Sequence, residues 1–314
     1  MRNMRESSRR TRLPLLFLFL LLFAAPVPAL GVEPTAGKVF LWKAQSNRGV
    51  AYILGSIHFM KREMYPLDGR IEAAYAGSSV LAVETDIRAR GKEGLGKFVM
   101  ENALYPENDA LEKHLSPETY DLVRRKLSDL GMARVNRMKP WALALTATTI
   151  EYMKMGLDPE YGIDRYFLEK ADGRKKIVEL EAYDYVVNLL NGLPDGIQDL
   201  FLFYTLTDLA KVGKEIDDII AYWSAGDARG MESVVFESVN EYPKLRPVYE
   251  ILVSRRNRDM ASKIEEYLRR GERCFAVVGA GHLVGRDGII ELLRAKGYAV
   301  EQLGTVLEND VAGP

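Results

Sequence analysis

The sequence predicts an α/β fold in which strands from both ends of the chain share one sheet and a helical region packs over it. Short apolar runs, typical of buried strands, lie close to both ends of the chain. Between them, from about residue 92 to 154 and again from about 186 to 268, apolar residues recur with helical spacing. Together these patterns predict a single α/β domain with a large helical middle.

The first predicted elements are strands. Residues 39–43 and 50–54 are apolar runs on either side of a polar turn, which is a hairpin signal. Residues 67–76 have a helical pattern. The next strand, residues 80–86, is apolar until it ends in two acids, Glu84 and Asp86.

The middle of the chain carries helix start signals. Ser116 and Pro117 fit the N-cap and the first position of a helix. Pro140 opens another helix, which we expect to run to Met155. A further helix is expected to end at Ala171, after the segment Gly162–Asp164.

The remaining elements alternate between strands and helices. Residues 176–181 form a third apolar run that ends in acids, Glu179 and Glu181. The helical region that follows is interrupted by glycine and proline near residues 192–194, 226 and 242–243. The last elements are a strand at 274–278, a helix at 288–296 that Gly297 closes, and a strand at 298–303.

Composition excludes several classes of protein. With a formal net charge of −1, the chain lacks the basic excess of a general nucleic-acid binder, so we expect no nucleic-acid partner. Cys274 is the only cysteine, which excludes an intramolecular disulfide and a cysteine-rich zinc site. Because Cys274 lies in an apolar run, we expect a small core residue rather than a nucleophile.

The N-terminus predicts export. Five arginines within the first twelve residues precede an apolar run, residues 13–25, and small residues stand at Val27 and Ala29. This is the pattern of a secretory signal peptide, residues 1–29, cleaved after Ala29. We therefore expect a periplasmic or secreted protein that contacts the membrane only through an uncleaved signal. A single catalytic domain is expected at residues 35–305, with a frayed tail at 306–314.

Two histidines share one unusual context. A predicted strand runs into Gly55–Ser56–Ile57–His58, and another runs into Gly279–Ala280–Gly281–His282. Each histidine would lie in a loop at the carboxyl end of its strand, where open α/β sheets place their ligands. If the two strands are parallel neighbours, His58 and His282 converge, and neutral imidazoles suit a divalent transition metal. A single such histidine would be interpreted as a hydrogen-bonded loop residue, but two in matched contexts favour a site.

Catalytic metal sites often add a carboxylate. Glu84 is the leading candidate, as a ligand or a general base, and in a strand it would point to the same face as Asp86. The alternative for both is a solvated strand end. Glu179 and Glu181 repeat the arrangement more weakly. Asp164 could be a ligand, but the cap of a helix N-terminus is the preferred interpretation.

The other polar candidates are less specific. His114, just before the predicted cap at Ser116, is interpreted as an exposed loop residue. The basic cluster Arg255–Arg258 is expected to form a solvated helix face. One arginine, with Arg256 preferred, could face the pocket as a catalytic group and stabilise a developing oxyanion.

A rival hypothesis uses the same glycines. Gly279, Gly281 and Gly285 follow a strand and open a helix, and Glu301 lies about twenty residues further on, which outlines a dinucleotide fingerprint. The third glycine is one position late, and too little chain remains for the second half of such a domain. Export would also separate the protein from nicotinamide cofactors.

These segments resemble the TraB/PrgY/GumN family, which includes the Tiki proteases. The paired Gly-x-x-His motifs with the intervening glutamate are the mark of that family. One departure is Ser56, where the family more often has threonine. The matching segments are LWKAQSNRGVAYILGSIH, MYPLDGRIEAAYAGSSVLAVETD, KPWAL, GLDPEYGIDRYFLEKA, IVELEAYDY, RRNRDM and FAVVGAGHLVGRDGIIELLRAKGYAV.

The resemblance implies an erythromycin-esterase/ChaN-like fold, with a mixed central sheet flanked by helices on both sides. It also implies that His58, His282 and Glu84 match the metal and catalytic positions of the family. The implied activity is that of a metal-dependent peptidase, supported by manganese or cobalt. We therefore expect an exported metal-dependent hydrolase that uses Mn, Co or Zn and acts on a peptide or protein substrate.

Two alternatives stay open. The same pocket could bind a peptide, a haem or a metal in the cell envelope without turnover, and ChaN-like relatives make haem plausible. The GumN name suggests an accessory role in polysaccharide export.

Overall fold

The computed structural model describes residues 37–88, 97–98 and 100–304. The predicted signal peptide, residues 1–29, and the predicted tail, residues 306–314, therefore lie outside the described residues. No helix in the described part of the chain combines the length and the apolar character needed to cross a membrane.

A six-stranded mixed sheet forms the centre of the molecule, with strand order β4-β3-β5-β2-β1-β6. The four strands β4, β3, β5 and β2 are parallel, whereas β1 runs antiparallel to both β2 and β6. The predicted mixed sheet is confirmed. The strands are β1 (Leu41–Gln45), β2 (Val50–Ser56), β3 (Val80–Val83), β4 (Lys176–Glu179), β5 (Arg273–Gly279) and β6 (Ala299–Gln302).

Strand pairing brings the two ends of the chain together. The predicted hairpin is present, with Leu41 opposite Leu54. In the parallel pair of β2 and β5, Ser56 lies opposite Gly279, so both loops that carry the histidines leave the sheet at the same edge. This register answers the condition that the sequence left open: β2 and β5 are parallel neighbours.

The dinucleotide hypothesis does not survive this topology. In the dinucleotide-binding βαβ unit, the strand after the helix lies directly beside the first strand in the sheet. Here β2 and β1 lie between β5 and β6, the strand that carries Glu301, so β6 is at the far edge of the sheet and not beside β5.

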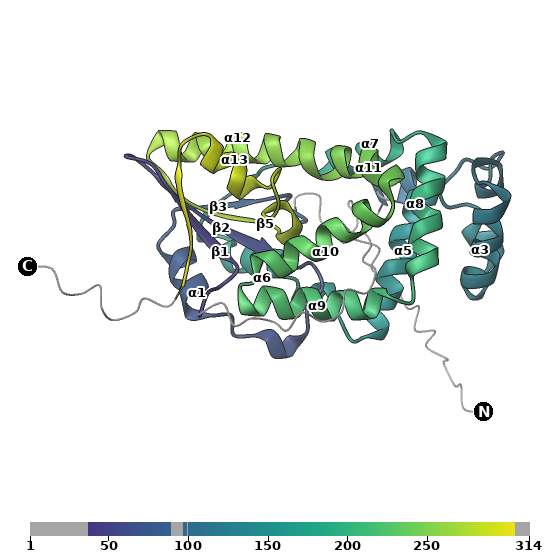
Figure 1. Cartoon of the computed structure of the whole chain (residues 1–314), viewed down its shortest axis with the longest axis horizontal. Helices are drawn as coiled ribbons and strands as arrows, with labels where there is room; N and C mark the ends of the chain where they lie inside the picture. Colours follow the sequence, from purple (N-terminus) through teal and green to yellow (C-terminus); the bar gives the residue numbers. More distant parts are fainter. Residues whose placement is uncertain (1–36, 89–96, 99, 305–314) are drawn as a thin grey trace, which may run out of the picture.

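Helices cover both faces of the sheet. In Figure 1, α12 and α13 lie along one face, and α1 and α6 lie along the other. Tyr75 of α1 and Phe167 of α6 both contact the ring of Phe275 in β5, which supports their shared face. The helices are α1 (Gly69–Ala76), α3 (Pro117–Leu127), α4 (Met132–Val135), α5 (Pro140–Lys154), α6 (Ile163–Ala171), α7 (Tyr183–Asn191), α8 (Asp195–Asp208), α9 (Val212–Ala225), α10 (Ala228–Glu241), α11 (Arg246–Tyr249), α12 (Arg255–Arg270) and α13 (Ile289–Ala295).

The helix signals predicted several boundaries. Ser116 caps α3 by accepting a hydrogen bond from the backbone N–H of Thr119. Pro140 opens α5, and Gly297, with φ of 88°, follows the end of α13. A π-helical turn, Glu250–Ser254, joins α11 to α12 and was not expected from the sequence.

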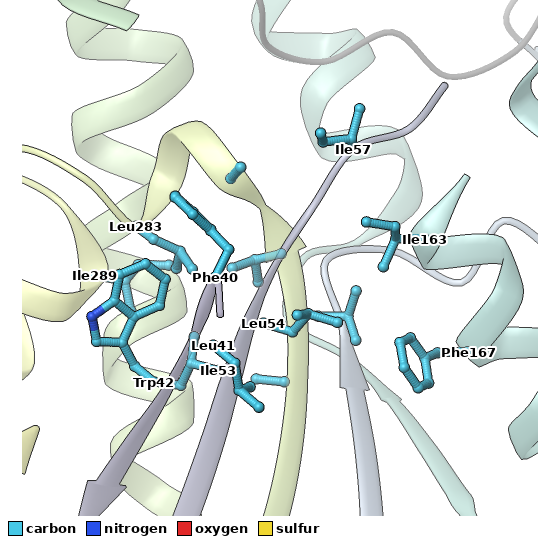
Figure 2. Close-up of a cluster of buried hydrophobic side chains, with 14 of the residues drawn as sticks. Phe40, Leu41, Trp42, Ile53, Leu54, Ile57, Ile163, Phe167, Leu283 and Ile289 are labelled. Atoms are coloured by element: carbon cyan, nitrogen blue, oxygen red, sulfur yellow. The ribbon is translucent and has the colours of Figure 1, made fainter. Parts of the chain in front are cut away.

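Buried hydrophobic side chains form two clusters. The sheet cluster surrounds the strands and is shown in part in Figure 2, where Phe167 of α6 and Ile289 of α13 lie beside them. Cys274 belongs to it, as predicted, and is fully buried. The helical cluster includes residues of α3, α5, α7 and α8, such as Leu143 and Leu190. These amphipathic helices therefore bury their apolar faces against one another and not against the sheet.

Candidate functional site

Gly279, the last residue of β5, lies at the centre of the candidate site. A Cβ atom placed on Gly279 would be 3.4 Å from Cδ2 of His282, 3.6 Å from Oε2 of Glu84 and 3.8 Å from Nε2 of His58. The structure thus brings together three residues that the sequence singled out, although more than 200 positions separate the two histidines. A side chain at Gly279 would fill the space into which they point.

His58 is held by a carboxylate from α6. Its Nδ1 lies 2.6 Å from Oδ2 of Asp164, and the hydroxyl of Ser56 donates to Oδ1 of the same carboxylate at 2.9 Å. The predicted capping role of Asp164 is wrong, because Gly162 occupies the N-cap of α6. The carboxylate of Asp164 is instead used by the imidazole and hydroxyl of the neighbouring loop.

His282 is fully buried and is held from α12. Its Nδ1 is hydrogen-bonded to Oδ1 of Asn257, whose Nδ2 donates to the backbone carbonyl of Asp287 at 2.8 Å. Nε2 of His282 has no hydrogen-bond partner within the described residues and lies 4.0 Å from Oε1 of Glu84. Burial, together with the nearby charge of Arg256, lowers the pKa of His282 to about 3, so the ring is neutral at physiological pH.

Glu84 follows β3 directly and is buried with both oxygens engaged. Oε1 accepts a hydrogen bond from Nη2 of Arg256, and Oε2 accepts one from the backbone N–H of Gly279 at 3.2 Å. Burial alone would raise the pKa of Glu84, but Arg256 and the two histidines outweigh it and hold this pKa at about 2. The Glu84 side chain is therefore a fixed anion.

Arg256 lies fully buried behind Glu84 and does not share the solvated face expected for its cluster. Its Nε donates to the two carboxylate oxygens of Glu181 at 3.0 and 2.9 Å, and its Nη1 donates to the carbonyl of Leu252 at 3.0 Å. Burial raises the pKa of Glu181, although Arg256 opposes that change. Arg256 is thus a bridge between two buried carboxylates from neighbouring strand ends.

Asp86 and Glu179 lie outside this cluster. Asp86 forms an ion pair with Arg88 at 3.1 Å, and its backbone N–H donates to Glu179 at 2.9 Å. The alternation of side chains between the two faces of a strand would place Asp86 and Glu84 on the same face. Because β3 ends at Val83, neither residue is in the strand and this alignment does not apply.

His114 is not the exposed loop residue that the sequence suggested. It ends a short 3₁₀ helix, and its ring stacks on Tyr105 with centroids 4.3 Å apart. Its Nδ1 lies 2.8 Å from Asp195, and its Nε2 lies 2.9 Å from Asp109. Burial lowers the pKa of His114, but these two carboxylates outweigh it and raise that pKa overall. His114 is a polar link within the helical region.

The positions of Asn257 and Glu181 carried little signal in the sequence. Asn257 stands inside an arginine-rich run that is typical of a solvated helix face. The sequence offered Arg256 as the arginine that could face the pocket, but only the packing of α12 over the strand ends shows that Asn257 is buried beside it. The sequence marks Glu181 as a strand-end acid, but it does not identify Arg256 as the partner of that carboxylate.

The donor types in the site suit a divalent transition metal. Two imidazoles and one carboxylate are common ligands of such ions. Within the described residues, however, no three or more His, Cys, Asp and Glu side chains are grouped so that they could hold a metal ion. The chemistry of the donors, two imidazoles and one carboxylate around Gly279, fits such an ion.

Comparisons with known proteins identify a matching family and related proteins. A family model described as "TraB/PrgY/gumN family" matches residues 40–302. The uncharacterized protein YbaP of Shigella flexneri is 25% identical over 247 residues, covering 78% of this chain and 88% of YbaP. YbaP of Escherichia coli (strain K12) is 25% identical over 246 residues, covering 77% and 87%.

A third relative is described as a metalloprotease. The metalloprotease TIKI homolog of Amphimedon queenslandica is 36% identical over 80 residues, which are 25% of this chain and 14% of that protein. No solved structure matches the chain significantly.

Proposed function

The chain belongs to the TraB/PrgY/gumN family, and from this premise we propose that it is a metal-dependent hydrolase that cleaves peptides or proteins. His58, His282 and Glu84 would hold the ion, which is Mn, Co or Zn. The observation that carries the proposal is Nε2 of His282, fully buried and without a hydrogen-bond partner in the described residues. A buried polar atom of this kind is costly unless something binds it, and a cation beside Glu84 would do so.

The local charge balance supports a cation. In formal charges, Arg256 contributes one positive charge, and Glu84 and Glu181 contribute one negative charge each, so the three together are singly negative. The histidines add no charge when neutral. A site that is negative and buried attracts a divalent ion more strongly than an exposed one.

The position of each residue in the site indicates its role. A bound ion would polarise the scissile carbonyl and lower the pKa of water. Glu84, already fixed by Arg256 and Gly279, is better suited to hold a cation than to move protons. Arg256 acts through Glu84, since its guanidinium is committed to two carboxylates. The side chain of His58 is 19% exposed and that of His282 is fully buried, so substrate would approach from the His58 side.

The relatives support the reaction class, because one is named a metalloprotease. We further propose that the protein acts outside the cytoplasm on a peptide or protein substrate. This part of the proposal rests on the secretory pattern of residues 1–29.

The test is metal retention by the mature chain, starting at Leu30. Wild type, His58→Ala, His282→Ala and the control His114→Ala would be loaded with manganese, cobalt or zinc, desalted and measured by elemental mass spectrometry. We expect about one ion per chain in wild type and in the control, and loss in the other two. Circular dichroism would show that all four are folded.

Two results would contradict the proposal. Stoichiometric metal in His58→Ala or His282→Ala would show that these residues are not the ligands. Absence of metal from wild type would remove the metal site and favour the binding of a peptide or haem without turnover. Retention as expected would justify a peptide-library cleavage screen with the loaded enzyme.

A further inference from the structure

Asn257 determines which ring nitrogen of His282 carries the proton. The backbone carbonyl of Asp287 can only accept hydrogen bonds, so the amide nitrogen of Asn257, 2.8 Å away, must face it. The amide oxygen of Asn257 therefore faces His282, and this oxygen also can only accept. Nδ1 of His282 is then the protonated nitrogen, and in the neutral ring Nε2 carries the lone pair.

Asp164 imposes the same order on His58. A carboxylate only accepts hydrogen bonds, so the hydroxyl of Ser56 donates to one oxygen and Nδ1 of His58 donates to the other. When the ring of His58 is neutral, its lone pair is then on Nε2. That nitrogen faces the space at Gly279 that it shares with His282.

We propose that Asp164 and Asn257 are positioning residues, which fix His58 and His282 as Nδ1–H tautomers so that both Nε2 lone pairs face the space at Gly279. Histidines that bind metals commonly donate their other N–H to a carboxylate or carbonyl oxygen, and loss of that partner weakens metal binding roughly 10–100-fold. The tautomers follow from the hydrogen bonds alone. Only their effect on metal retention rests on the proposed function.

Loss of Asn257 should reverse the tautomer of His282. Without the amide oxygen, Nδ1 has lost the acceptor that the structure gives it. The carboxylate of Glu84 lies on the other side of the ring, 4.0 Å from Nε2. The proton is therefore expected to move to Nε2 and to face Glu84, which would block that nitrogen as a ligand.

The chain suits a direct test because it has only three histidines. Nitrogen-15 would be introduced into the histidine rings of the metal-free mature chain, and two-bond proton–nitrogen correlations would assign the protonated nitrogen of each. In wild type we expect Nδ1–H for both His58 and His282. His114, with both nitrogens against carboxylates, gives a separate pattern and reports that the chain is folded.

The variants test each positioning residue separately. Asn257→Ala should move His282 to Nε2–H and leave His58 unchanged, and Asp164→Ala should change His58 alone. Asn257→Asp should restore the wild-type tautomer, because a carboxylate also accepts from Nδ1. Asn257→Ala and Asp164→Ala should each weaken manganese binding roughly 10–100-fold.

Several outcomes would overturn the proposal. An Nε2–H tautomer of either histidine in wild type would do so even if no variant folds. An unchanged His282 in a folded Asn257→Ala chain would also refute it. The expected tautomers in a wild type that retains no metal would refute the proposed function and leave this inference standing. Retained metal together with an Nε2–H tautomer of either histidine would refute this inference and leave the proposed function standing.

Discussion

At the scale of single residues, the site depends on one buried guanidinium. Arg256 donates hydrogen bonds to Glu84, to Glu181 and to the carbonyl of Leu252. One side chain therefore links the ends of two strands to the helical segment that precedes α12. Buried ion pairs contribute little net stability when complete, because desolvation offsets their attraction. Removal of one partner is different, since it leaves the remaining charges buried and unpaired.

Arg256→Met is therefore expected to destabilise the fold by about 3–5 kcal/mol, because two carboxylates would stay buried without their cation. The matched control is Arg258→Met, two residues along α12. Arg258 pairs with Glu250 at 2.7 Å, but both side chains are more than half exposed. Its loss should change stability by no more than about 1 kcal/mol. Urea unfolding of the two variants measures the difference, and equal effects would contradict the bridging role of Arg256.

The sequence could identify the histidines and Glu84 because each follows an apolar strand at a recognisable distance. It could not identify the partner of His58, since Asp164 lies 106 positions away. It also could not separate Asn257 from its arginine neighbours. Helical spacing tells which residues share a face, but the burial of that face depends on how α12 lies across the sheet.

At the scale of elements, close approach of backbones sets the geometry around His58. The backbone N–H of Ile163 donates to the carbonyl of Ile57 at 3.1 Å, so the start of α6 is bound to the loop after β2. A Cβ atom on Gly162 would lie 2.4 Å from the carbonyl oxygen of His58. Glycine is required there to bring Asp164 within reach of the imidazole.

Gly162→Ala should cost roughly 1–3 kcal/mol, because the His58 backbone must move to admit the methyl group. Gly196→Ala is the matched control. Gly196 lies in α8, and no atom would stand within 4 Å of its added Cβ. That change should be neutral or stabilise the fold by up to about 1 kcal/mol. Chemical denaturation compares the two, and a Gly162→Ala chain as stable as wild type would show that the contact is not tight.

Element boundaries with a chemical cause were predictable, and those without one were not. Ser116, Pro140 and Gly297 mark helix ends through caps and fixed dihedral angles, and they lie where expected. The π-helical turn at Glu250–Ser254 has no comparable signature. It ends at Ser254, two residues before Arg256, and α12 begins at Arg255.

At the scale of the whole molecule, the site lies where the sheet cluster meets the helical cluster. One continuous helical segment, from α11 through the π-helical turn to α12, passes through both. Leu252 and Val253 pack in the helical cluster, and Met260 and Ile264 pack in the sheet cluster. Arg256 and Asn257 stand between these two pairs. Because this segment packs in both clusters, we expect unfolding of one cluster to destabilise the other.

The two clusters are therefore expected to unfold together, as the single domain predicted for residues 35–305 requires. The three tryptophans make this testable, because Trp141 lies in the helical cluster while Trp42 and Trp223 lie in the sheet cluster. A Trp141→Phe chain reports on the sheet cluster, and a Trp42→Phe/Trp223→Phe chain reports on the helical one. Within each variant, urea transitions followed by fluorescence and by circular dichroism should coincide. An earlier fluorescence transition of Trp141 would instead show that the helical cluster opens alone, releasing one end of the segment that holds Arg256 and Asn257.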